Sequence, residues 1–143
     1  IRIFYVLAFA LLLFIGCEDD QKVFPYVHIN ETFDVGTELN NLAIGEFIFI
    51  DNKNGRYGYG GFIIYRSSQN NFQAFDRACT YKPAEKCIIE RDEEYESLVT
   101  CPCCESQFLV SENGMVFKGP ATRRLKKYRT TYLKNSNQLR IQN

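Results

Sequence analysis

The sequence predicts an all-β fold, an antiparallel sandwich or small barrel, and three observations support this class. Aromatic and β-branched residues, including twelve Phe and nine Tyr, gather in short runs. Gly, Asn, Asp and Ser separate the runs, as is usual where turns join strands. Helical periodicity of useful length is missing after the first sixteen residues. Asn113-Gly114 is the strongest hairpin signal, because both residues tolerate the positive φ of a tight turn.

Residues 3–16, IFYVLAFALLLFIG, form an apolar run that ends at Cys17. Fourteen residues are too few for a spanning helix and match the apolar region of a secretion signal. The end of the run, FIGC, resembles the lipobox of bacterial lipoproteins, in which the cysteine is acylated and starts the mature chain. We therefore expect a lipoprotein signal peptide at 1–16, a lipid on Cys17 and a lipid-anchored tether at 17–22.

The stretch CEDD resembles the acidic export tag of Bacteroidetes lipoproteins. We therefore expect an outer-membrane lipoprotein, periplasm-facing or on the cell surface, with the membrane as a partner through its lipid and no nucleic-acid partner. Residues 113–143 hold eight bases and no acid, but bases alternate with apolar residues along RRLKKYRTTYL. This pattern is typical of the solvated face of a strand.

Residues 23–143 have the size of one ordinary domain. Glycine-rich NGRYGYGG, 54–61, is expected to be a flexible loop rather than a phosphate site, since no helix follows it. Acidic RDEEYE, 91–96, is expected to be a polar hairpin rather than a catalytic pair. The expected strands are, in chain order, 23–29, 46–51, 61–66, 72–77, 87–92, 97–101, 107–111, 114–119, 124–133 and 138–143.

If Cys17 is acylated, five cysteines remain: Cys79, Cys87, Cys101, Cys103 and Cys104. An odd number leaves three alternatives: four metal ligands and one spare thiol, two disulfides and one free thiol, or one disulfide and three thiols for another task. Cys101 and Cys104 have the Cys-x-x-Cys spacing of redox pairs, which usually lie at a helix N-terminus. Strands are expected on both sides here, which disfavours a redox pair.

A metal site agrees better with the expected strands, because two loops that leave strands at one end of a sandwich can grip one centre. Cys101 and Cys104 form one knuckle, and Cys79 with Cys87 could supply the other side. Four thiolates suit tetrahedral zinc or a 2Fe-2S cluster, since both favour sulfur.

From about Gly61 to Tyr128 the chain resembles a Rieske iron-sulfur domain. GFIIYR and FQAFDRACTY resemble the strands that lead to the family's first ligand box, Cys-Thr-His. CPCCESQF resembles the second box, Cys-Pro-Cys-His-Gly-Ser-x-Phe, and NGMVFKGPATRRLKKY resembles the hairpin, Gly-Pro-Ala turn and closing strand. The resemblance implies one Rieske-like antiparallel β-sandwich over 23–143, with two cysteine-bearing loops.

The ligand boxes depart from the family pattern at both histidines. Cys79 and Cys101 match the family's cysteines, whereas Tyr81 and Cys104 occupy the histidine positions. The single histidine, His28, lies far upstream and is expected to be an ordinary polar residue. In Rieske proteins of cytochrome bc complexes an extra cysteine in each box forms a bridge, and Cys87 and Cys103 are the corresponding residues here.

The resemblance implies two arrangements. In the first, Cys79, Cys87, Cys101 and Cys104 bind a 2Fe-2S cluster or zinc, and a cluster serves one-electron transfer to an envelope redox partner. Thiolates in place of imidazoles would lower its reduction potential. In the second, the site holds no cluster, Cys87 pairs with Cys103, and the protein is a structural or binding lipoprotein with structural zinc or disulfides. We expect a substrate-converting enzyme in neither case.

Overall fold

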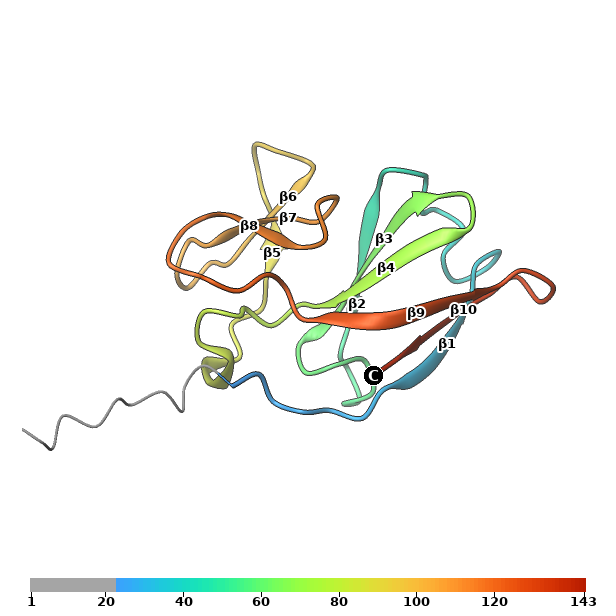
Figure 1. The fold of residues 1–143 in the computed structure, drawn as a ribbon, viewed down its shortest axis with the longest axis horizontal. Coiled ribbons are helices and arrows are strands. Elements are labelled where there is room, and N and C mark those ends of the chain that lie inside the picture. The colour runs from blue at the N-terminus through green and yellow to red at the C-terminus, as the bar shows by residue number, and fades with distance from the viewer. Residues whose placement is uncertain (1–22) are drawn as a thin grey trace, which may run out of the picture.

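The computed structural model describes residues 23–143 and confirms the all-β fold. Ten strands form two antiparallel sheets, with one short 3-10 helix, η3 (Pro83–Glu85), between them in the chain (Figure 1). The expected signal peptide at 1–16, Cys17 and the tether at 17–22 lie outside the described residues. Within the described part, no helix is long and apolar enough to cross a membrane.

The larger sheet has six strands in the order β1-β10-β9-β4-β3-β2. Its members are β1 (Asn30–Asp34), β2 (Phe47–Asp51), β3 (Gly61–Ser68), β4 (Asn71–Asp76), β9 (Lys127–Leu133) and β10 (Gln138–Gln142). Apolar side chains from both halves of this sheet meet in one hydrophobic core, so the sheet folds over on itself as a sandwich. The core residues that strands supply include Phe33, Phe62, Ile64, Phe72, Ala74, Tyr128, Leu139 and Ile141.

The smaller sheet contains four consecutive strands, β5 (Glu90–Arg91), β6 (Leu98–Thr100), β7 (Gln107–Leu109) and β8 (Met115–Lys118). Asn113 and Gly114, with φ of 62° and 67°, make the turn into β8, as their sequence predicts.

A second core packs the smaller sheet against the larger one. Ile63 of β3 and Phe75 of β4 contribute to it, together with Val99 and Phe108 of the smaller sheet. Because Phe62 belongs to the first core and Ile63 to the second, β3 is buried on both of its faces. The two cores together hold β3 and β4, the strand that leads into the first cysteine loop, between the two sheets.

The expected strands differ most from the structure at 23–29, 87–92 and 124–133, the last of which, β9, begins only at Lys127. Residues 23–29 form no strand, and β1 begins only at Asn30. Pro25 in that segment has no N–H to donate to a ladder, which disfavours a strand there. The strand expected at 87–92 is reduced to β5, because its first half pairs with the chain after β4 through a bridge between Ala78 and Ile88.

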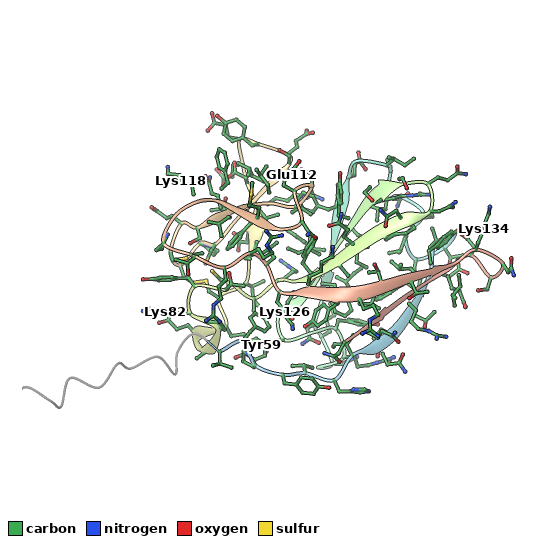
Figure 2. The ribbon with its side chains drawn as sticks, viewed as in Figure 1. Tyr59, Lys82, Glu112, Lys118, Lys126 and Lys134 are labelled. Carbon is green, nitrogen blue, oxygen red and sulfur yellow. A yellow bond between two sulfur atoms is a disulfide. The ribbon has the colours of Figure 1, made fainter. Side chains whose placement is uncertain are left out.

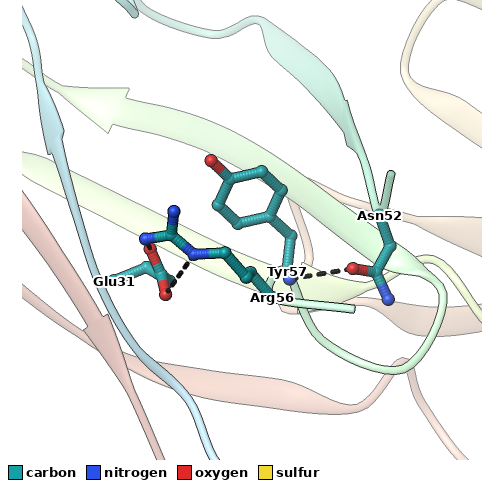
Figure 3. Close-up of polar contacts among 4 residues, drawn as sticks. All are labelled: Glu31, Asn52, Arg56 and Tyr57. Carbon is teal, nitrogen blue, oxygen red and sulfur yellow. Dashed lines mark hydrogen bonds and ion pairs between the residues drawn. The ribbon is translucent and has the colours of Figure 1, made fainter. Parts of the chain in front are cut away.

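The glycine-rich segment 54–61 is a loop, as expected, but it is held in place rather than free. Arg56 forms a two-point ion pair with Glu31 of β1, at 2.7 and 3.3 Å (Figure 3). The Tyr57 N–H donates to the Asn52 side chain at 3.0 Å (Figure 3). The loop is thereby tied to the edge strand of the larger sheet.

A buried carboxylate at the end of β4 fixes the start of the first cysteine loop. Asp76 accepts hydrogen bonds from the N–H groups of Tyr59, Gly60 and Ala78, and from the Tyr128 hydroxyl, at 2.6–2.9 Å. Burial raises the pKa of Asp76 above its ordinary value, although these four donors oppose the rise. The clamp places Ala78, and so Cys79, in a defined position relative to the larger sheet.

Candidate metal site

The first cysteine loop runs from Arg77 to Ile89 and is closed at its base. The Cys79 N–H donates to the Cys87 carbonyl at 2.9 Å, and the Ile89 N–H donates to the Arg77 carbonyl at 2.7 Å. The Arg77 guanidinium also donates to the Ile89 carbonyl at 3.2 and 3.3 Å. These contacts hold Cys79 and Cys87 opposite each other across the base of the loop.

The second cysteine loop joins β6 to β7 and folds into a tight knuckle. The Cys101 N–H donates to the Ser106 carbonyl, and the Glu105 N–H donates to the Cys101 carbonyl, both at 2.8 Å. Glu105 has a positive φ of 59°, which reverses the chain before β7.

The first cysteine loop lies at one end of the molecule. Figure 2 shows Lys82, on this loop, at the end opposite Lys134, which lies in the turn between β9 and β10.

Three free thiols from the two loops meet between them. The Sγ atoms of Cys79, Cys101 and Cys104 all lie within 4.8 Å of one another. The Sγ atoms of Cys79 and Cys104 are 3.7 Å apart. Cys79 and Cys101 are buried, and Cys104 is partly exposed. The structure therefore brings together three of the four thiols that the sequence predicts as ligands.

The fourth expected ligand, Cys87, is not available, because a disulfide joins it to Cys103. A sulfur in a disulfide carries no thiolate charge with which to bind a metal. Of the four thiols expected as ligands, only Cys79, Cys101 and Cys104 are free. The bond is the pairing that the family resemblance implies, and it links the two loops beside the three thiols.

Polar groups near the three sulfurs act against the effect of burial on their pKa values. The backbone N–H of Tyr81 acts to lower the pKa of Cys79, and those of Cys103 and Cys104 act to lower the pKa of Cys101. Cys104 Sγ lies 3.2 Å from the Ser106 hydroxyl. Such donors stabilise a thiolate more than a thiol.

The pKa values of the three thiols differ in direction. Burial raises the pKa of Cys79 and of Cys101 above the ordinary value for a thiol. Burial acts in the same sense on Cys104, but hydrogen bonds from the Ser106 hydroxyl and N–H and from the neighbouring thiols lower its pKa. Cys104 is therefore the first of the three to deprotonate as the pH rises.

Two further residues considered in the sequence analysis are Tyr81 and His28. Tyr81, in the family's first histidine position, is 37% exposed, and Lys82 Nζ is 5.8 Å from the centre of its ring. His28, expected to be an ordinary polar residue, borders a surface groove together with Arg129 and Arg140 of the larger sheet. The described residues thus place no imidazole at the site.

A third loop, which joins β8 to β9, contacts the second cysteine loop. The sequence did not indicate a functional role for Ser106 or for the residues of this third loop. The Ser106 hydroxyl accepts the Ala121 N–H at 3.0 Å while it contacts Cys104. Gly119 has a φ of 101°, and a Cβ at this position would lie 2.5 Å from Ser106 Cα. Only glycine allows this close approach. The Gly-Pro-Ala turn was visible in the sequence, but its contact with Ser106 was not.

The fold and the two loops define the class of protein. Residues 42–129 match the Rieske 2Fe-2S domain family, and the chain belongs to this family. Among solved structures, the chain is similar to the cyanobacterial plasma membrane Rieske protein PetC3 from Synechocystis PCC 6803, with a TM-score of 0.50 and 19% identity. The likeness covers 82% of this chain and 100% of the other, and at this identity it shows the shared fold. A search of curated proteins gave no match.

The donor set does not fit the family's cofactor. A Rieske cluster takes two cysteines on one iron and two histidines on the other. Cys79 and Cys101 supply the first pair, but Cys104 and Tyr81 stand in the histidine positions. Ligands of different irons are separated by both metals and the sulfides between them, whereas here all three sulfurs lie within 4.8 Å of one another. The site therefore lacks both the ligand types and the spacing of the family's centre.

Proposed function

We propose that this protein is an envelope lipoprotein that uses the Rieske fold to present a thiolate metal centre made of Cys79, Cys101 and Cys104. One observation carries the proposal: three free thiols from two separate loops meet within 4.8 Å. Such convergence of free thiols from two loops is typical of metal sites with cysteine ligands.

A second candidate is one-electron transfer through a 2Fe-2S cluster to an envelope redox partner. Membership of the Rieske family supports it, as do Cys79 and Cys101 at the family's cysteine positions. It would require a fourth ligand that is not a cysteine, because Cys87 and Cys103 are bonded to each other. We therefore rank it below a sulfur-ligated centre of another kind.

Metal content tests the proposed centre. The full chain, purified anaerobically from membranes in detergent, is expected to contain bound metal at a fixed ratio per chain. A Cys79→Ser/Cys104→Ser variant is expected to contain none, because one thiolate alone does not retain the ion. Elemental analysis of both proteins is the measurement. A natural chain without metal, even after anaerobic incubation with zinc or iron, would overturn the proposal.

The envelope location rests on the sequence around Cys17, outside the described residues. We propose that Cys17 is acylated and that the lipid anchors the domain in the outer membrane. Cells grown with radiolabelled palmitate are expected to label the full chain and not a Cys17→Ser variant. Equal labelling of both proteins, or of neither, would refute the lipid anchor. Protease treatment of intact cells would then tell a surface-exposed domain from a periplasm-facing one.

A further inference from the structure

We infer that Cys79, Cys101 and Cys104 hold a single zinc-type divalent ion with an open fourth coordination position, in place of the family's two-iron cluster. This inference rests on the proposed function and specifies the kind of centre. It concerns how many metal ions the site holds, which sulfurs bind them and what completes the coordination.

The spacing of the sulfurs matches one ion. A tetrahedral ion with metal–sulfur bonds of about 2.3 Å holds its sulfur ligands about 3.8 Å apart. The Sγ atoms of Cys79 and Cys104 are 3.7 Å apart, and Cys101 Sγ lies within 4.8 Å of both. An ion placed among the three would reach all of them with small movements of the side chains. Two irons would require Cys104 to move away from the other two sulfurs.

The chemistry of the donors selects the metal. Three thiolates and no imidazole favour borderline or soft ions, and zinc is the common divalent ion of this kind in cysteine knuckles. The Ser106 hydroxyl lies 3.2 Å from Cys104 Sγ and can donate to it once Cys104 is a thiolate. This contact spreads part of the negative charge that one divalent ion does not cancel when three thiolates bind it.

The fourth position has no cysteine to fill it among the described residues. Cys87 and Cys103 are bonded to each other beside the site. Zinc sites with three protein ligands keep the fourth position for water or another small ligand. Cys79 and Cys101 are buried, whereas Cys104 is partly exposed, so an incoming ligand would approach from the Cys104 side. We infer that this position takes water or a small thiolate.

Cobalt provides a spectroscopic probe of such a site. Titration of the metal-free full chain with Co²⁺, kept anaerobic and without thiol reductants so that the disulfide stays intact, is expected to saturate at one ion per chain. Sulfur-to-cobalt charge-transfer bands and the strong visible bands of tetrahedral cobalt should appear together, and Zn²⁺ should remove both. Addition of imidazole, a small ligand that leaves the disulfide intact, is expected to shift the visible bands without loss of the metal.

Matched variants assign the ligands. Cys79→Ser and Cys104→Ser are each expected to weaken Co²⁺ binding more than about 100-fold, beyond the effect usual for outer-shell changes. Ser106→Ala is expected to weaken it about tenfold, because the three sulfurs remain while the hydroxyl that contacts Cys104 and accepts the Ala121 N–H is lost. The Cys87→Ala/Cys103→Ala control should keep one ion and the same bands. If that control does not fold, mass spectrometry of the alkylated natural chain replaces it: Zn²⁺ should protect Cys79, Cys101 and Cys104 and no other cysteine.

The outcomes separate this inference from the proposed function. Two irons and two acid-labile sulfides per chain would overturn the single ion and leave a thiolate metal centre in place. Binding that persists in Cys104→Ser but is lost in Cys87→Ala/Cys103→Ala would show that other sulfurs hold the ion. This result would also overturn the inference. No binding of cobalt, zinc or iron would overturn both proposals.

Discussion

A Tyr81→His/Cys104→His variant is expected to accept a 2Fe-2S cluster, with about two irons and two acid-labile sulfides per chain after anaerobic reconstitution. The two substitutions restore the donor set of the family, since Cys79 and Cys101 already stand at its cysteine positions. The fold, the closed loops and the disulfide are present, and replacing Cys104 also removes the sulfur that lies too close to Cys79 and Cys101 for a two-iron centre. Its reduction potential should fall between about −150 and +300 mV, the range of histidine-ligated clusters.

Iron and sulfide assays, visible absorption and the electron paramagnetic resonance spectrum of the reduced protein are the measurements. The matched control is Tyr81→Phe/Cys104→Ser, which changes the same positions without adding nitrogen ligands and should take up no cluster. Uptake of equal iron and sulfide by the natural chain would show that the two histidines are not what the site lacks.

A Cys87→Ala/Cys103→Ala variant is expected to lose about 3 kcal/mol of unfolding free energy, as predicted for a cross-link that closes a loop of this length. The disulfide spans a sequence separation of 16 residues and joins the two cysteine loops. Without it the unfolded chain gains freedom, while the folded loops keep their hydrogen bonds. The melting temperature should fall by roughly 10–15 °C for a domain of this size.

Thermal and urea denaturation, followed by circular dichroism, measure this loss. A thiol reductant should lower the stability of the natural chain to that of the variant and should leave the variant unchanged. All proteins are first stripped of metal, and the control is then Cys104→Ala, which removes a partly exposed thiol outside the disulfide and should cost less than about 1 kcal/mol. A natural chain whose stability does not respond to reductant would contradict the expected role of the bond.

Much of the fold was predictable because strand signals act locally. The Asn113-Gly114 turn was expected from its tolerance of positive φ, and both residues have it. The strand predicted at 23–29 was wrong because the prediction gave the apolar residues of this segment more weight than Pro25. The segment at 87–92 was wrong in extent because its first half pairs with the first cysteine loop, a contact that depends on the chain far upstream.

The cysteine loops could be found from sequence, but the role of each thiol could not. Five thiols permit several pairings, and their spacing does not show the direction in which each sulfur points. Cys87 was expected among the ligands, whereas the closed base of its loop places its sulfur in a bond with Cys103. Ser106 was overlooked because its contact with Cys104 depends on Gly119 and Ala121 in a third loop.

The described chain starts beside the first cysteine loop (Figure 1). Phe24 packs against Tyr59 and borders the same pocket as Thr80 and Pro83. The seven residue steps from Cys17 to Phe24 extend over at most about 25 Å. With a lipid at Cys17, this short segment would therefore keep the three thiols close to the bilayer surface. A molecule that exchanges metal, electrons or a thiol with them would have to work in that thin layer, and a partner embedded in the same membrane would meet them without the protein detaching.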